Sequence, residues 1–218
     1  MTRAVIFDLD GTLIDSAPDI HAAANRLMER HGMAPFTPPE TRDFVGKGVP
    51  HFIGCCLKAR DRDGDAGLHA QLVAEFVAGY ETAVTLTQVY PGVAAALADL
   101  SRMGHRLAIC TNKPLAPARA VLAHLGLDAH FAVVIGGDSL DLRKPDPAPL
   151  HAAARALGAR DVLFVGDSEV DAETAARARL PFALYTQGYR KAPVEALPHT
   201  RAFDHFDALP GIVADLLP

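Results

Sequence analysis

Short apolar runs alternate with longer amphipathic stretches over most of the chain. Five runs have the length of strands and are almost entirely apolar, at residues 4–9, 107–110, 132–135, 162–165 and 182–185. Strands that are apolar on both faces are typical of a parallel sheet covered on both sides. Helical patterns lie between these runs, at residues 93–103, 114–125, 147–157 and 169–179. This alternation predicts an α/β fold with a doubly wound, Rossmann-like parallel sheet.

The segment after the first strand breaks the alternation. From residue 18 to residue 82 the pattern is helical only, with helices expected at 19–31, 39–44, 49–58 and 68–82. An insertion that leaves the sheet and returns to it is the simplest account. We therefore predict two domains, a core of residues 1–16 and 83–218 and a small all-helical cap domain of residues 17–82.

The composition is that of an ordinary globular protein. The 218 residues include 21 Lys and Arg against 26 Asp and Glu, which gives a formal charge of −5. A mildly acidic chain without a basic block has no electrostatic attraction for nucleic acid or for an anionic membrane. The charge of an anionic substrate must then be met locally, by a few residues or by a metal.

The cysteines and the N-terminus bear on the compartment. Two of the three cysteines, Cys55 and Cys56, are sequence neighbours, and Cys110 is distant, which suits neither a disulfide nor a zinc site. No stretch approaches about 18 apolar residues, and acids interrupt the first apolar run too early for a secretory signal. We expect a cytoplasmic protein with no membrane or nucleic-acid partner.

Acidic residues stand where predicted strands end. Asp8 and Asp10 close the first run, and Asp167 follows the run at 162–165. Ligands of open α/β sheets bind at the carboxyl ends of strands, so these carboxylates are candidates for a site. A turn explains Asp10 but leaves Asp8 unexplained. Asp171 has two interpretations that stay open, a metal ligand and a capping-box partner of Ser168.

Carboxylates that converge without His or Cys suit a hard cation with oxygen ligands, above all Mg²⁺. Thr111 closes the run at 107–110, and Lys144 precedes a proline. A threonine at a strand end is usually a turn residue and a lone lysine is usually solvated. A lysine in a stiffened segment near three carboxylates is a stronger signal.

Taken together, four short motifs resemble those of the haloacid dehalogenase-like hydrolases. They occur in order and in matching strand contexts: Asp8-x-Asp10-Gly11-Thr12-Leu13-x-Asp15-Ser16, Thr111-Asn112, Lys144-Pro145 and Gly166-Asp167-Ser168-x-x-Asp171. The resemblance spans nearly the whole chain. The helical insertion is similar to the small cap of the subgroup that contains phosphoglycolate phosphatases.

The resemblance implies a role for each motif residue. Asp8 would be the nucleophile that forms an aspartyl-phosphate, and Asp10 the general acid and base. Thr111, Asn112 and Lys144 would bind phosphate. Mg²⁺ would be held by the side chains of Asp8 and Asp167 and the backbone carbonyl of Asp10, with Asp171 a ligand or a partner of one. Relatives that cleave carbon–halogen or carbon–phosphorus bonds lack an aspartate at the place of Asp10, so its presence favours phosphoryl transfer.

One stretch of the insertion has an unusual composition for a helix. Gly46, Lys47 and Gly48 open a turn whose amides, followed by a helix N-terminus, are able to cradle an anion. The alternative is a plain loop between helices. The resemblance to the specificity loop of capped phosphatases favours contact with the substrate.

We therefore predict a Mg²⁺-dependent phosphatase acting on a small phosphorylated metabolite, first of all 2-phosphoglycolate, as a monomer or homodimer. A sugar-phosphate phosphatase or β-phosphoglucomutase-like phosphoryl transferase is the alternative enzyme. A binding or regulatory protein that kept the fold without turnover is the alternative from another class.

Overall fold

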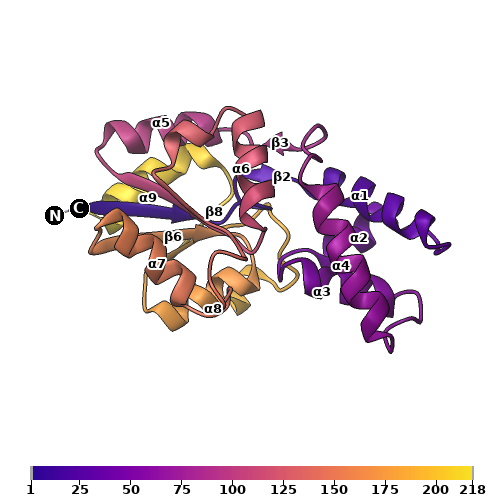
Figure 1. Cartoon of the computed structure of the whole chain (residues 1–218). Coiled ribbons are helices and arrows are strands. Elements are labelled where there is room, and N and C mark those ends of the chain that lie inside the picture. Colours follow the sequence, from indigo (N-terminus) through magenta and orange to yellow (C-terminus); the bar gives the residue numbers. More distant parts are fainter. Residues whose placement is uncertain (1, 218) are drawn as a thin grey trace.

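A six-stranded parallel sheet forms the centre of the computed structural model, which describes residues 2–217 (Figure 1). The strands are β1 (Arg3–Phe7), β4 (Arg106–Cys110), β5 (Val133–Ile135), β6 (Asp161–Gly166), β7 (Phe182–Tyr185) and β8 (Arg201–Phe203), in the order β5-β4-β1-β6-β7-β8. The five predicted strands are confirmed. In the register, Ala4 lies between Arg106 of β4 and Val162 of β6.

Helices cover both faces of this sheet. They are α5 (Val93–Arg102), α6 (Leu115–His124), α7 (Ala148–Leu157), α8 (Glu169–Ala178) and α9 (Leu209–Leu216). Strand β1 shows why its whole run is apolar. Val5 and Phe7 pack with α5, α6 and α9, while Ala4 and Ile6 pack with α7 and α8 on the opposite face. In Figure 1, α5 and α9 accordingly lie on the other side of the sheet from α7 and α8.

Four further helices pack together beyond one end of the sheet (Figure 1). They are α1 (Ala17–Arg30), α2 (Pro38–Phe44), α3 (Val49–Lys58) and α4 (Ala66–Tyr80), and we call residues 17–80 the helical segment. Their buried apolar side chains form a cluster separate from the two clusters of the sheet. The rings of Phe52, Phe76 and Tyr80 continue through this cluster, with centroids 5.2 and 5.1 Å apart. The division into a core domain and a cap domain stays a prediction.

The chain enters and leaves the helical segment through a two-stranded antiparallel sheet. Its strands are β2 (Ile14–Asp15) and β3 (Gln88–Val89), in which Ile14 pairs with Val89. The two connections therefore run side by side.

Helix limits differ slightly from the sequence predictions. Pro114 and Pro147 precede α6 and α7 as cap residues, where we expected first helical residues. At the other ends, α5, α6 and α8 each stop one residue earlier than predicted. Three 3₁₀ turns, η1 (Asp128–His130), η2 (Val194–Ala196) and η3 (Phe206–Ala208), complete the elements.

Over residues 2–217, none of the helices combines the length and apolar character needed to cross a bilayer.

Candidate active site

The order of the strands places the predicted motifs at one edge of the sheet. After β1 the chain builds β4 and β5 on one side and then returns to β6 on the other. The ends of β1 and β6 therefore flank the switch point at which ligands of such sheets bind. Asp8 follows β1, Thr111 follows β4 and Asp167 follows β6. The structure thus brings together residues that are far apart in sequence.

Three carboxylates form a buried acidic cluster at this edge. One oxygen from each of Asp8, Asp167 and Asp171 lies within 4.8 Å of the others. Burial, followed by the charge of Asp171, raises the pKa of Asp8 to about 7. Burial and the charges of Asp171 and Asp8 also raise the pKa of Asp167 well above its ordinary value. Three negative charges held this close in a low dielectric call for positive charge nearby.

Lys144 supplies one such charge. Its ammonium lies 2.8 Å from Asp8 Oδ1 and 2.7 Å from Asp171 Oδ1, and the residue is 3% exposed. Burial lowers the pKa of Lys144, but the charges of Asp171 and Asp8 outweigh this and the pKa is raised. Lys144 is therefore a fixed cation beside the predicted nucleophile.

The charge and the donor atoms of the acidic cluster suit a second cation beside Lys144. Asp8 Oδ1 is buried, and the Lys144 ammonium is its one ion-pair partner among the described residues. One ammonium against three carboxylates leaves an excess of negative charge. Oxygen donors without His or Cys fit a hard divalent cation such as Mg²⁺. The residues present therefore fit the predicted metal.

Asp171 performs the structural role that we had considered for it. The backbone amide of Ser168 donates to Asp171 Oδ2 at 3.1 Å, and the Asp171 amide donates to Ser168 Oγ at 3.4 Å, which together form a capping box at the start of α8. The Ser168 hydroxyl also donates to Asp171 Oδ2, at 2.6 Å. The same carboxylate holds Lys144 and belongs to the acidic cluster. Its role toward a metal stays a prediction.

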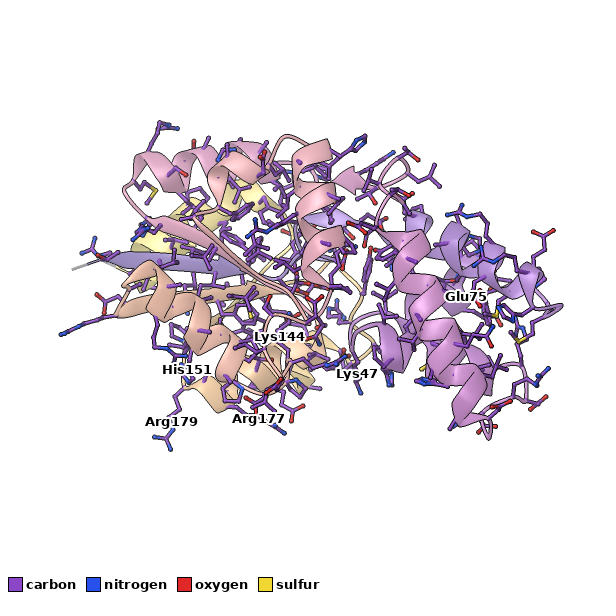
Figure 2. All side chains as sticks on the ribbon, in the orientation of Figure 1. Lys47, Glu75, Lys144, His151, Arg177 and Arg179 are labelled. Atoms are coloured by element: carbon purple, nitrogen blue, oxygen red, sulfur yellow. The ribbon has the colours of Figure 1, made fainter. Side chains whose placement is uncertain are left out.

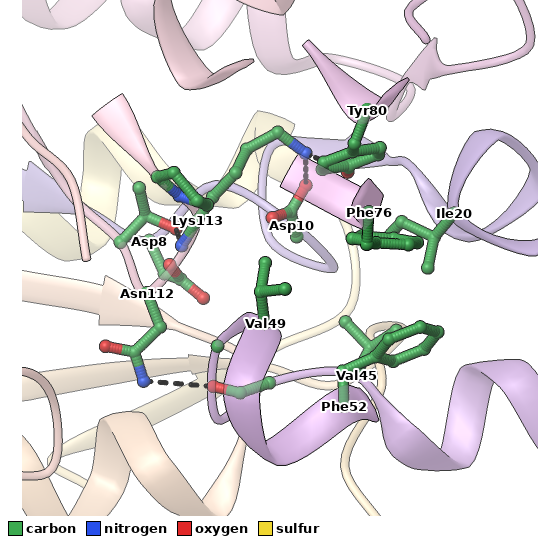
Figure 3. Close-up of a pocket in the computed structure, with 14 residues that line it drawn as sticks. Asp8, Asp10, Ile20, Val45, Val49, Phe52, Phe76, Tyr80, Asn112 and Lys113 are labelled. Atoms are coloured by element: carbon green, nitrogen blue, oxygen red, sulfur yellow. Dashed lines mark hydrogen bonds and ion pairs between the residues drawn. The ribbon is translucent and has the colours of Figure 1, made fainter. Parts of the chain in front are cut away.

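Asp10 has other partners than the three carboxylates of the acidic cluster. Its Oδ1 accepts from Ser16 Oγ at 2.5 Å and from Lys113 Nζ at 2.9 Å. The same ammonium donates to the Tyr80 hydroxyl, at the end of α4 (Figure 3). The side chain predicted to act as acid and base is thus held by a hydroxyl from one side and by a cation from the other.

Lys113 and Tyr189 are two site residues that sequence reasoning missed. Lys113 directly follows Thr111 and Asn112, and this adjacency was the only available signal. Tyr189 donates its amide to Asp167 Oδ2 at 2.6 Å, from a loop after β7 that has no motif. Thr12 also donates to Asp167, at 2.6 Å from Oδ1, and lies in the first motif.

The predicted phosphate-binding residues take different positions. Thr111 and Asn112 line the space in front of Asp8. The Asn112 amide, however, donates to the carbonyl oxygens of Lys144 at 2.9 Å and Gly46 at 3.1 Å. Asn112 therefore joins the Lys144 loop to the loop of the helical segment, while its own Oδ1 is buried and finds no hydrogen-bond partner within residues 2–217.

Two spaces open from Asp8 and Asp10. The inner pocket has a free volume of about 50 Å³, and apolar side chains of the helical segment form part of its wall. It is lined by Asp8, Asp10, Ile20, Val45, Gly46, Gly48, Val49, Phe52, Phe76, Tyr80, Thr111, Asn112, Lys113 and Pro114. The outer cleft has a volume of about 460 Å³, and its charged and polar lining residues include Lys47, His51, Asp167, Glu169 and Lys191.

The glycine loop of the helical segment divides between these spaces. Gly46 and Gly48 have φ angles of 120° and 84° and line the inner pocket. Lys47 is exposed and lines the outer cleft. Figure 2 shows Lys47 and Lys144 on the two sides of the region where the helical segment meets the sheet. Direct contact of this loop with a substrate stays a prediction.

Comparison with known proteins decides the family. The sequence model of the haloacid dehalogenase-like hydrolases matches residues 2–179. The chain belongs to this family. A phosphoglycolate phosphatase of Rhodobacter capsulatus is 50% identical to this haloacid dehalogenase-like hydrolase over 213 residues, covering 98% of this chain and 97% of that protein. A phosphoglycolate phosphatase of Cereibacter sphaeroides is 53% identical over 214 residues, covering 98% of each.

A crystal structure of a protein from Haemophilus somnus, described as a predicted phosphoglycolate phosphatase, has the same fold. It matches this haloacid dehalogenase-like hydrolase with a TM-score of 0.88 at 27% identity, and covers 97% of this chain and 98% of that one. The predicted resemblance and the α/β fold class are therefore confirmed. The roles of the individual site residues stay predictions.

Proposed function

We propose that this hydrolase is a Mg²⁺-dependent phosphatase that hydrolyses 2-phosphoglycolate through an aspartyl-phosphate intermediate. Two relatives at 50% and 53% identity over almost the full chain are phosphoglycolate phosphatases, and this observation carries the choice of substrate. The choice of reaction is supported by the ion pair of Asp8 with Lys144 and by the position of Asp10, which lines the same pocket as Asp8.

In the proposed reaction, a carboxylate oxygen of Asp8 attacks the phosphorus and the bond to the leaving oxygen breaks. Asp10 gives its proton to that leaving alkoxide, which departs as glycolate. Asp10 then takes a proton from water, and the resulting hydroxide attacks the phosphorus of the aspartyl-phosphate. Inorganic phosphate leaves and the Asp8 carboxylate is restored. One residue can act as acid and then base because the reaction has two steps.

The surroundings support these roles. Lys144 holds positive charge beside Asp8, which reduces the repulsion between this carboxylate and a phosphate dianion. Ser16 and Lys113 fix the orientation of the Asp10 carboxylate. Mg²⁺, held by Asp8 and Asp167, would neutralise phosphate charge when bound.

Phosphate release from a panel of esters tests the proposal. The panel contains 2-phosphoglycolate, glucose 1-phosphate, glucose 6-phosphate and pyrophosphate, each with Mg²⁺ and with chelator. We expect kcat/KM to be highest for 2-phosphoglycolate and activity to disappear with chelator. We expect Asp8→Asn to lose about 10⁴-fold or more of kcat. Asp63→Asn, at an exposed carboxylate of a turn, is the matched control and keeps full activity.

The reaction type, the metal requirement and the turnover are each contradicted by a different result. Interconversion of glucose phosphates without net phosphate release would identify a phosphoryl transferase. Activity that survives chelation would remove the metal from the proposal. Binding of 2-phosphoglycolate without turnover by the wild-type protein would identify a binding protein.

We also propose that the enzyme is cytoplasmic and acts as a monomer or homodimer. Three free thiols, two of them buried, are consistent with a reducing compartment. Cell fractionation and light scattering after size-exclusion chromatography test the two statements separately.

A further inference from the structure

We infer that Lys113 is the specificity-determining residue that binds the carboxylate of 2-phosphoglycolate, an inference that rests on the proposed function. The carboxylate is the group that distinguishes this substrate from a simple alkyl phosphate. A carboxylate that enters a pocket walled by phenylalanine and valine side chains loses its hydration and needs a charged partner there. Among the described residues that line the inner pocket, Lys113 alone carries a positive charge.

The position of Lys113 relative to Asp10 fits the connectivity of the substrate. Asp10 faces the leaving oxygen in the proposed reaction. In 2-phosphoglycolate that oxygen and the carboxylate are attached to the same methylene carbon. The cation that binds the carboxylate must therefore lie next to the general acid. Lys113 Nζ is 2.9 Å from Asp10 Oδ1, with the apolar wall of the helical segment facing both (Figure 3).

The ammonium of Lys113 has hydrogen-bonding capacity left for a ligand. An ammonium group carries three N–H donors. Asp10 Oδ1 and the Tyr80 hydroxyl accept two of them. The third is available to a carboxylate in the inner pocket. Both partners also hold the ammonium in place before a substrate arrives, so little side-chain freedom is lost on binding.

The size of the inner pocket agrees with a short leaving group. Its free volume is about 50 Å³. A buried water requires roughly 10–15 Å³ on the same scale, so the pocket holds about three to five water-sized groups. Glycolate matches this volume, whereas a hexose exceeds it and would need the outer cleft, which also borders Asp8 and Asp10.

The other lysines of the site are less suitable. Lys144 already neutralises Asp8 and Asp171. Lys47, the cation of the predicted specificity loop, is exposed at the outer cleft, where water screens its charge. Lys47 nevertheless offers a matched comparison, because it is a lysine of the same site that faces the other space.

The test compares 2-phosphoglycolate with ethyl phosphate, in which a methyl group replaces the carboxylate. The measured quantity is the ratio of their kcat/KM values. We expect the wild-type ratio to exceed 10 and to fall roughly 10- to 150-fold in Lys113→Met. A role of Lys113 that acts only through Asp10 lowers both kcat/KM values alike and leaves the ratio unchanged. Lys47→Met is expected to keep the wild-type ratio within about threefold.

A second variant covers the case in which Lys113→Met does not fold, as judged by circular dichroism. Lys113→Gln keeps an N–H donor and removes the charge, and it is expected to lower the ratio in the same direction. Three results would overturn the inference while phosphoglycolate hydrolysis stands. They are an unchanged kcat/KM ratio in the folded Lys113 variant, a wild-type ratio near 1, and a ratio that falls in Lys47→Met instead of in the Lys113 variants. A wild-type enzyme that does not hydrolyse 2-phosphoglycolate overturns the proposed function, and the inference with it.

Discussion

Tyr189 donates its backbone N–H to Asp167 Oδ2 at 2.6 Å and thereby connects the acidic cluster to the helical segment. Its hydroxyl accepts from the amides of Ser16 and Ala17, at 2.9 and 3.0 Å, where α1 begins. The guanidinium of Arg42, from α2, lies over its ring at 4.7 Å from the centroid. One residue thus contacts the predicted metal site and two helices of the helical segment.

The Tyr189 hydroxyl should contribute measurably to stability. In Tyr189→Phe the buried amide of Ser16 loses its acceptor, which costs about 1–3 kcal/mol. For a chain of this size we expect Tm to fall by roughly 2–10 °C in a thermal melt. Tyr90→Phe is the control, because the Tyr90 hydroxyl is buried without a hydrogen-bond partner among the described residues. An equal loss of Tm in both variants would contradict the assignment.

Gly188 allows the Tyr189 loop to approach Asp167. A Cβ atom at residue 188 would overlap Cβ and Oδ2 of Asp167. Gly188→Ala should therefore displace this carboxylate, with a loss of about 1–3 kcal/mol of unfolding free energy. We also expect the Mg²⁺ concentration for half-maximal activity to rise about 10- to 100-fold.

The control for this substitution is Gly79→Ala, on the exposed side of α4, where a Cβ meets nothing within 4 Å. It should raise the free energy of unfolding by about 0.5–1 kcal/mol, since alanine is the better helix former. Urea unfolding distinguishes the opposite signs. A Gly188→Ala enzyme with unchanged Mg²⁺ dependence would show that Asp167 does not hold the metal.

Lys144 should be essential for stability as well as for activity. In Lys144→Met the carboxylates of Asp8 and Asp171 lose their ion-pair partner inside the protein. Removal of one partner from a buried pair costs about 3–5 kcal/mol, and we expect this loss in urea unfolding with chelator. Arg143→Met changes the exposed neighbouring cation and should stay within about 0.5 kcal/mol of wild type. Similar stabilities for the two variants would refute the role of Lys144 in balancing the cluster.

The thiols should differ in reactivity. Burial raises the pKa of Cys56 and of Cys110 to about 12, so neither forms a thiolate near neutral pH in the folded protein. Cys55 is partly exposed, and its Sγ lies 3.4 Å from His51 Nε2. We expect a thiol reagent at pH 8 to modify one group rapidly and the other two only after unfolding. Mass spectrometry of peptides identifies the modified residue, and Cys55→Ser should abolish the rapid phase.

The sheet was predictable where burial leaves a continuous apolar run. Strands β1, β4 and β6 are such runs because helices cover both of their faces. Strand β8 escaped prediction, since Phe203 is its only buried residue. Strands β2 and β3 have two residues each and carry no periodic signal.

The candidate site was predictable to the extent that it stands at strand ends. Asp8 and Asp167 could be assigned because a carboxylate that follows a buried strand has few structural reasons to be there. Lys113 and Tyr189 could not be assigned from the sequence, because only the fold brings them to their partners. Lys113 is 103 residues from Asp10, and Tyr189 is more than 20 residues from Asp167. Lys47, whose loop composition predicts a substrate contact, lies exposed at the outer cleft, and that contact stays a prediction.

The central position of β1 has a consequence for synthesis of the chain. Its partners β4 and β6 begin only at residues 106 and 161. A nascent chain therefore carries its first strand unpaired on the β6 side until about three-quarters of the protein has left the ribosome. Asp8 and Asp167, which follow these two strands, therefore come together only when that late pairing forms.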